Sequence, residues 1–179
     1  MRAILLLLFL VGCSSKVVTT PGQPPVVVES PQVESLVNVT KFTNFTKKEV
    51  DKAKKYIPVM DETIRSKCFA DFMMARDMID LGGKTKAQVI QDLTTKTVSI
   101  ELITYYKRWS KVHGYTYPNV NKIWLNRKYH AGASLCSEAS NLAHELSHKL
   151  GYKHAYKATR SRPYSVPYSI NAAFKVCCK

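Results

Sequence analysis

The chain has 179 residues, no visible internal repeat and a formal net charge of +14, with 27 Lys and Arg against 13 Asp and Glu. This length allows one compact domain plus short extras and excludes a repeat array. Residues 41–179 carry 25 of the 27 basic and 11 of the 13 acidic residues, so the whole positive charge belongs to this part of the chain.

The N-terminus, MRAILLLLFLVG, pairs one basic residue with an apolar run too short to span a bilayer. This pattern predicts that residues 1–12 are a secretory signal peptide. The cysteine that follows, Cys13 in LVGCSS, resembles the lipobox of bacterial lipoproteins, which implies that Cys13 becomes a lipidated N-terminus. The resemblance places the protein in the bacterial cell envelope, at the outer membrane because Ser14 stands where inner-membrane lipoproteins usually carry aspartate. An ordinary secretory signal cut elsewhere is the alternative.

Residues 13–40 are rich in Pro, Ser, Thr and Val with little periodicity, and are predicted to be a flexible tether, with a short edge strand at PVVVE as the alternative. A basic domain held to a membrane by its lipid would meet anionic lipids, cell-wall polymers or acidic protein segments. A solvated basic surface without a specific partner is the alternative. Nucleic acid is not expected, because an exported chain rarely meets it and no nucleic-acid motif accompanies the charge.

Residues 41–96 show helical patterns. Thr46, with Glu49 three residues later, has the spacing of a capping box and predicts the start of a helix. This helix is expected to run to about Tyr56 and to bend or restart at Pro58. The whole segment is predicted to be either part of the mature domain or a propeptide.

Two further helices are predicted in the same segment. CFADFMMARDMIDL, residues 68–81, continues with apolar residues at helical spacing and is expected to stop at the following pair, Gly82 and Gly83. Its methionines are interpreted as core residues rather than ligands. KTKAQVIQDL is a short helix with Thr85 as its cap.

The pattern then changes to strands. TVSIELITYY, residues 97–106, is rich in β-branched and aromatic residues that alternate, which predicts a strand. GYTYP is a turn into a second strand over Lys122–Asn126. The segment GASLCSEASNLAHELSHKLG returns to helix, with Ser137 as the N-cap and Gly151 as the stop. Helices, then strands, then a long helix predict an α+β domain over residues 41–179.

Four cysteines lie beyond Cys13. An even number in an exported chain favours disulfides. Adjacent Cys177 and Cys178 could pair with each other only under strain. One of them is therefore expected to reach Cys68 and the other Cys136, which would pin the C-terminal tail to the body of the domain. Free thiols or a metal cluster are the alternatives.

Three of the five histidines fall within eleven residues, in NLAHELSHKLGYKH. His144 and His148 are four residues apart on the predicted helix, so both imidazoles project from one face and can bind one metal ion. Glu145 can reach a water at the metal without binding the ion itself. Zinc needs a third protein ligand, but no Asp or Glu follows Glu145 in the chain. Gly151 can instead turn the chain so that His154 reaches the same ion.

The segment from His144 to His154 matches every fixed position of H-E-x-x-H-x-x-G-x-x-H, the signature of the metzincin zinc endopeptidases. The chain resembles this family over about residues 97–170. The resemblance implies a catalytic core over residues 97–179, with a small mixed sheet, a long active-site helix and one catalytic zinc ion on three histidines. It also implies that NKIWLN is the edge strand that lines the substrate cleft.

The resemblance also points to residues after the motif. Metzincins carry a methionine turn beneath the metal, and the corresponding stretch here, YSVPYSI, has Val166 or Pro167 where methionine is expected. Many members place an aspartate after the third histidine, where this chain has Ala155. Tyr168 stands where some members place a tyrosine that stabilises the transition state, so it is assigned this role, with Tyr164 as the rival.

The sequence thus predicts an anchored zinc endopeptidase that hydrolyses proteins or peptides, with Glu145 as general base. Hydrolysis of cell-wall peptide cross-links is one alternative. The other belongs to a different class: a non-catalytic envelope lipoprotein that keeps zinc as a structural staple and binds anionic polymers. His113 and His130, outside the motif, are expected to be ordinary core or surface residues.

Overall fold

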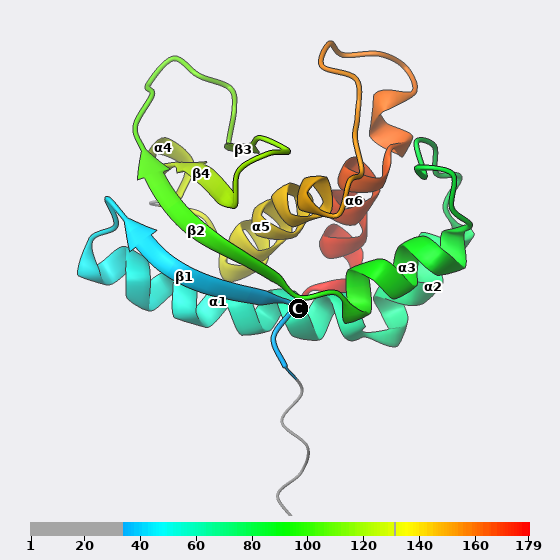
Figure 1. Cartoon of the computed structure of the whole chain (residues 1–179), viewed down its shortest axis with the longest axis horizontal. Coiled ribbons are helices and arrows are strands. Elements are labelled where there is room, and N and C mark those ends of the chain that lie inside the picture. The colour runs from blue at the N-terminus through cyan, green and yellow to red at the C-terminus, as the bar shows by residue number, and fades with distance from the viewer. Residues whose placement is uncertain (1–33, 131) are drawn as a thin grey trace, which may run out of the picture. The chain divides into compact units, whose positions relative to one another are not determined.

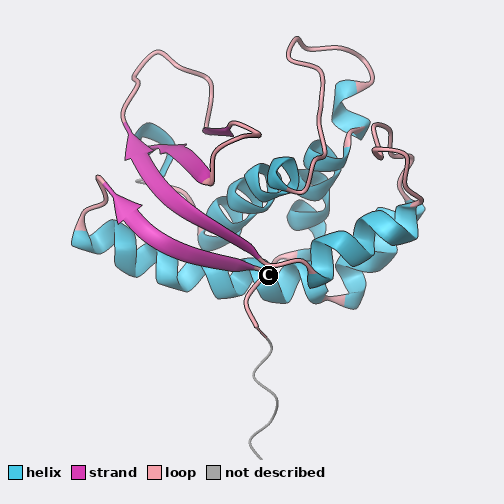
Figure 2. Ribbon diagram, viewed as in Figure 1, coloured by secondary structure: helices cyan, strands magenta, loops and turns pink. Residues whose placement is uncertain are grey.

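The computed structural model describes residues 34–130 and 132–179 (Figure 1). The predicted signal peptide, the lipidation of Cys13 and most of the predicted tether lie outside the described residues. The secondary structure is mixed, as Figure 2 shows, which confirms an α+β fold with a small mixed sheet. In chain order the elements are β1 (Val37–Thr43), α1 (Lys47–Arg65), α2 (Lys67–Ala75), α3 (Lys86–Thr95), β2 (Val98–Tyr105), β3 (Gly114–Thr116), β4 (Lys122–Asn126), α4 (Arg127–His130), α5 (Leu135–Lys149), η1 (Arg162–Tyr164) and α6 (Val166–Cys177).

The four strands form one sheet in the order β1-β2-β4-β3. β1, β2 and β4 are parallel, whereas β3 runs antiparallel to β4. β2 shows the predicted alternation, with Ile100 and Leu102 fully buried, because every second side chain of a strand points to the same face.

The strand at this edge of the sheet is β3 and not the predicted segment NKIWLN. Lys122–Asn126 forms β4 as expected, but β4 lies between β2 and β3 and is not an edge strand. The stretch GYTYP, predicted to be only a turn, contains all of β3, which pairs with β4 through Tyr115 and Trp124 and forms the edge. Three residues are too few to show an alternation in the sequence, so the pattern could not indicate this strand.

The domain begins earlier than predicted. Residues 34–40 fall in the predicted tether, but β1 starts at Val37, and both Leu36 and Val37 are only 3% exposed. β1 pairs with β2, where Val37 lies opposite Val98. Because this partner is distant in the sequence, local composition could not indicate the strand. The predicted helical part is accordingly helical only from α1 onward.

The capping box at the start of α1 is confirmed. The Thr46 hydroxyl accepts a hydrogen bond from the Glu49 backbone N–H (3.3 Å), and the Glu49 carboxylate accepts one from the Thr46 backbone N–H (2.7 Å). The predicted end near Tyr56 with a restart at Pro58 is wrong, because α1 continues through Pro58 to Arg65. Proline inside a helix costs about 3 kcal/mol, but Tyr56 and Met60 on either side are almost fully buried. The burial of this face outweighs the lost hydrogen bond.

α2 ends at Ala75, before the glycine pair that was expected to stop it. Arg76 is its extended C-cap, and the guanidinium donates a hydrogen bond to Ser169 Oγ on α6 (3.1 Å). Three residues later, Ile79 forms an isolated β-bridge with Ser165. The residues that follow α2 therefore contact the segment around the start of α6 and do not continue the helix to the glycine pair.

The N-caps of α3 and α5 can be compared with the predicted ones. Thr85 caps α3 as predicted, and its hydroxyl accepts a hydrogen bond from the Gln88 backbone N–H (3.2 Å). The cap predicted for α5 is wrong: α5 begins at Leu135 and its N-cap is Ser134, which accepts a hydrogen bond from the Ser137 N–H (3.2 Å). Serine favours the N-cap position, so the sequence allowed either Ser134 or Ser137. Ser134 is the N-cap because it directly precedes the first turn of α5.

α5 lies between the sheet and α6 (Figure 1), and it packs against α1, α6 and β3. Its apolar face is buried as the spacing predicted, through Ala139, Leu142, Ala143 and Leu146. Among the described residues, no helix is both long and apolar enough to cross a membrane.

Both predicted disulfides are confirmed. Cys177 is bonded to Cys68 on α2, and Cys178 to Cys136 on α5. Two adjacent cysteines at the end of α6 thus attach this helix to two others. The bridge from Cys68 joins residues 109 apart in the sequence, so it ties the N-terminal helices covalently to the rest of the domain.

Candidate metal centre

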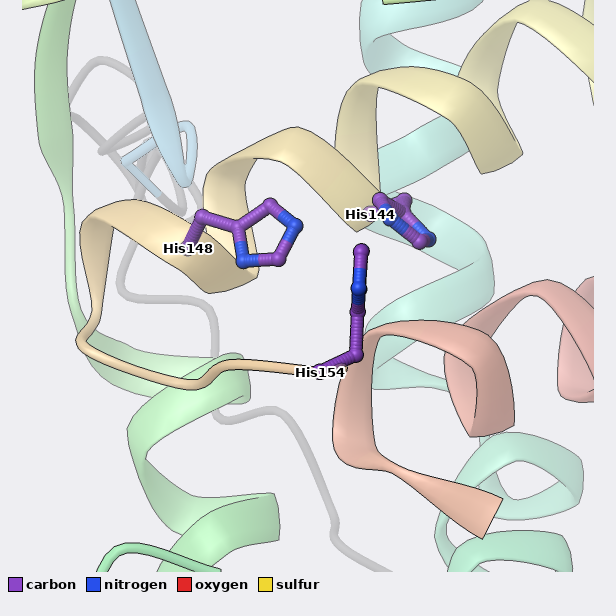
Figure 3. Close-up of side chains that lie close together, drawn as sticks. All are labelled: His144, His148 and His154. Carbon is purple, nitrogen blue, oxygen red and sulfur yellow. The ribbon is translucent and has the colours of Figure 1, made fainter. Parts of the chain in front are cut away.

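α5 and the segment after it bring three histidines together. His144 and His148 lie on the same face of α5, and His154 returns toward them from the following segment (Figure 3). Gly151 makes this return possible, since its φ of +96° lies in a region that other residues rarely adopt. The candidate ligand atoms of the three residues all lie within 4.8 Å of one another, so the group can hold a metal ion.

Backbone carbonyls orient all three rings. In each ring Nδ1 donates to a carbonyl: His144 to Pro167 (3.1 Å), His148 to Tyr152 (2.7 Å) and His154 to Ala155 (3.0 Å). A carbonyl oxygen only accepts, so each Nδ1 carries the proton and each Nε2 keeps a free lone pair. Three imidazole nitrogens with a fourth position open match the ligand set of catalytic zinc, and imidazole also suits copper, iron and nickel.

The three rings are in the neutral form that binds metals. Burial, reinforced by the neighbouring His148 and His154, lowers the pKa of His144 to about 3. Burial also lowers the pKa of His148 and the pKa of His154 below their ordinary value. At neutral pH, a metal ion therefore displaces no proton from these rings.

Glu145 follows His144 in the sequence but is not a member of the histidine group. It is 5% exposed, and burial raises the pKa of its carboxyl to about 8. Within residues 34–130 and 132–179 it forms no ion pair. A buried carboxyl with a pKa near neutrality can both accept and release a proton, as a general base must.

Tyr168, on α6, is the tyrosine that the structure brings to the histidines. Its ring centroid lies 5.1 Å from that of His144 and 5.0 Å from that of His154. Its rival, Tyr164, is 46% exposed, and its ring lies 5.4 Å from the guanidinium carbon of Arg76.

The stretch YSVPYSI packs against a histidine of the group without a methionine. Val166 is fully buried, and the Pro167 carbonyl accepts the hydrogen bond from His144 Nδ1. One turn further along α6, Asn171 Nδ2 lies 3.1 Å from the same nitrogen, but both atoms carry protons and form no hydrogen bond with each other; Asn171 Oδ1 accepts a hydrogen bond from Ser140 (3.0 Å). The start of α6 therefore holds the orientation of His144.

A contact from the N-terminal helices supports His148. Tyr152, whose carbonyl accepts the His148 hydrogen bond, is buried, and its hydroxyl donates to Asp92 on α3 (2.8 Å). Asp92 also pairs with Lys96 (2.8 Å) and Lys84. Burial raises the pKa of Asp92, but these three donors outweigh it and hold the pKa well below its usual range. The sequence pattern missed this support because Asp92 and Tyr152 are 60 residues apart.

Tyr152→Phe is expected to weaken Zn²⁺ binding about tenfold, because partners that orient a metal ligand contribute on that scale. Losing one hydrogen bond should also lower the free energy of unfolding by about 1 kcal/mol. Competition with a chromophoric chelator measures the first effect, and urea unfolding the second. Tyr56→Phe is the matched control, since the buried Tyr56 hydroxyl has no partner among the described residues. Equal Zn²⁺ affinity in both variants would contradict the support assigned to Tyr152.

The two remaining histidines are not members of the histidine group. His130 is buried, and its Nδ1 contacts the Glu138 carboxylate on α5. His113 stacks on Tyr129, with ring centroids 3.7 Å apart.

Comparison of the chain with protein-family models, with curated proteins and with solved structures gave no match. Its function must therefore be inferred from its own residues.

Proposed function

We propose that this chain is a zinc-dependent endopeptidase of the metzincin type, which hydrolyses peptide bonds in proteins or peptides. The observation that supports it best is the combination of three converging neutral imidazoles with the buried carboxyl of Glu145 beside them. A structural zinc site gains nothing from a base next to its ligands, whereas hydrolysis needs one.

Each residue of the site has a role in this reaction. His144, His148 and His154 would hold the zinc, which supplies Lewis-acid chemistry when bound because it acidifies water and polarises a carbonyl oxygen. Glu145 accepts the proton of the attacking water and then transfers it to the leaving amine. Tyr168 donates a hydrogen bond from its hydroxyl to the oxygen on which negative charge develops.

The edge strand β3 is the proposed binding site for an extended substrate, through main-chain hydrogen bonds. β3 packs against α5, the helix that carries Glu145. Gly114 permits this close packing, since a Cβ there would lie 3.1 Å from the Trp124 carbonyl oxygen and 3.2 Å from Asn141 Nδ2 on α5. An extended peptide chain suits this edge better than a compact small molecule does.

The proposed location is the bacterial cell envelope, where the lipid on Cys13 would hold the domain at the outer membrane. The +14 charge favours anionic envelope polymers as further contacts.

The test is cleavage of an unfolded protein by chain loaded with one equivalent of Zn²⁺. We expect fragments from the loaded protein, no cleavage after a chelator removes the metal, and recovery when Zn²⁺ is returned. Mass spectrometry of the fragments would show internal cuts. Cleavage of muropeptides alone would identify a cell-wall peptide hydrolase. Stoichiometric zinc without cleavage of protein, muropeptides or envelope extract would instead support a binding module with structural zinc.

A further inference from the structure

One arginine lies beside the histidine group without serving it as a ligand. Arg162, the first residue of η1, places its guanidinium carbon 4.8 Å from the centroid of the Tyr168 ring. The centroid of the Tyr168 ring lies 5.1 Å from the ring centroid of His144 and 5.0 Å from that of His154. A cation therefore stands next to the place where a substrate would react.

This cation has no carboxylate partner among the described residues. Two other half-buried cations have one: Arg127 pairs with Glu49 at 2.6 Å, and Lys52 with Glu138 at 3.2 Å. The half-buried Arg65, Arg76 and Lys149 have no carboxylate either, but each donates two hydrogen bonds to carbonyl or hydroxyl oxygens. Within the part of the chain that the structure describes, the Arg162 guanidinium has only a long hydrogen bond from Nη1 to the Tyr156 carbonyl (3.3 Å), and its buried Nε has no partner.

The surroundings of Arg162 supply few acids. No Asp or Glu follows Glu145 in the chain, whereas the segment that leads into η1 contains Lys153, Lys157 and Arg160, all exposed. Asp80 acts electrostatically on His154 but forms no ion pair with Arg162. The partner of Arg162 is therefore to be sought in another molecule.

We infer that Arg162 binds a carboxylate of the substrate, so that the site prefers acidic peptides; this deepens the proposed peptidase function and rests on it. A guanidinium presents its donors as a planar fork that matches a carboxylate. Stacking on Tyr168 holds this fork next to the reacting groups, and its half-buried position reduces screening by water. The carboxylate is either an internal Asp or Glu side chain or the C-terminal carboxylate of the peptide.

Three peptides of one sequence separate these two sources. The first carries an internal Glu and an amidated C-terminus, the second has Gln in place of the Glu and the same amide, and the third has Gln and a free C-terminal carboxylate. Binding is measured by fluorescence anisotropy to zinc-loaded Glu145→Gln protein, which should not cleave them, with the Glu placed at each position in turn. We expect the first or the third peptide to bind at least about tenfold more tightly than the second, the scale of a charged hydrogen bond.

Arg162→Gln in the same Glu145→Gln protein should make the affinities for the acidic and the neutral peptide about equal. The affinity for the neutral peptide should stay unchanged. Arg162→Lys keeps the charge without the fork and should retain only part of the preference. Arg160→Gln removes the same charge two residues away and should retain all of it. Zinc content and circular dichroism confirm that each variant is folded.

Three results would overturn the inference: no binding of any peptide, a preference that survives Arg162→Gln, or an equal loss in Arg160→Gln, which would indicate general attraction by a basic surface. Equal weakening of charged and neutral peptides by Arg162→Gln would also overturn it, since a purely structural role predicts that pattern. The binding assay does not depend on cleavage, so the two proposals can fail separately. If the protein bound acidic peptides selectively but the native protein cut none of them, the peptidase function would be refuted and the carboxylate-binding site would remain.

Discussion

Glu145→Gln is expected to lower the rate of peptide hydrolysis by at least about 100-fold while zinc stays bound at one ion per chain. General base catalysis contributes about 10² to 10⁴ in rate, and glutamine keeps the size of the side chain but cannot accept the proton. Zinc is retained because Glu145 is not part of the histidine group. Steady-state cleavage of a fluorogenic peptide, with metal analysis of the same samples, measures both quantities.

The matched control is Glu62→Gln, the same change at an exposed position of α1. It should leave both the rate and the zinc content unchanged. If Glu145→Gln cut the peptide as fast as the native protein, another group would have to be the base. If zinc were lost, the fall in rate would report the metal site instead of the carboxyl.

The same carboxyl should shape the pH dependence of the native rate. Glu145 acts as a base only when it is deprotonated, so the rate should fall as the pH drops below its pKa. Burial raises this pKa to about 8 in the absence of metal, and a bound cation lowers it again by favouring the charged form. The acid limb of the kcat profile of the native protein should therefore lie below pH 8, and it should disappear from the residual rate of Glu145→Gln.

Removing the Cys68–Cys177 bridge is expected to lower the free energy of unfolding by about 2–5 kcal/mol. The bridge closes a loop of 109 residues, and cross-links over long loops restrict the unfolded chain most. Both cysteines are changed together, as Cys68→Ala with Cys177→Ala, so that no free thiol can exchange with the neighbouring bridge. Thermal and urea unfolding under non-reducing conditions measure the loss.

The second bridge provides the comparison. Cys136 and Cys178 are 42 residues apart, so the double change Cys136→Ala with Cys178→Ala should cost about 0.8 kcal/mol less by the loop-entropy relation. An unchanged unfolding free energy for either pair would show that packing alone fixes the C-terminal end of α6. The reverse order of the two losses would show that native contacts matter more than loop length.

Local features of the fold could be predicted from the sequence because their causes are local. A capping box depends on residues three apart, as at Thr46 and Glu49, and the two ligands on α5 share a face because they are four apart. Gly151 does adopt the left-handed conformation that redirects His154. The disulfides followed from the count of cysteines and the strain of pairing neighbours.

The features that the sequence could not indicate depend on distant partners. β1 exists because it pairs with β2, and β3 rather than β4 is the edge because of how three separate segments assemble. α1 continues through Pro58 because the core buries the residues around it. The support of His148 by Asp92 and the stacking of Arg162 on Tyr168 likewise arise only in the folded chain.

The attachment of the N-terminal helices bears on how the proposed peptidase could be kept inactive before use. β1 is a strand of the sheet, Cys68 is bonded to Cys177, and Asp92 accepts a hydrogen bond from Tyr152, whose carbonyl contacts the candidate ligand His148. If the chain were cut between residues 96 and 97, the Cys68–Cys177 disulfide would still join the two pieces. If the N-terminal piece were then released, the sheet would lose β1, and the candidate metal site would lose the contact from Asp92 to Tyr152. We therefore expect residues 34–96 to stay with the rest of the domain instead of being removed as a propeptide.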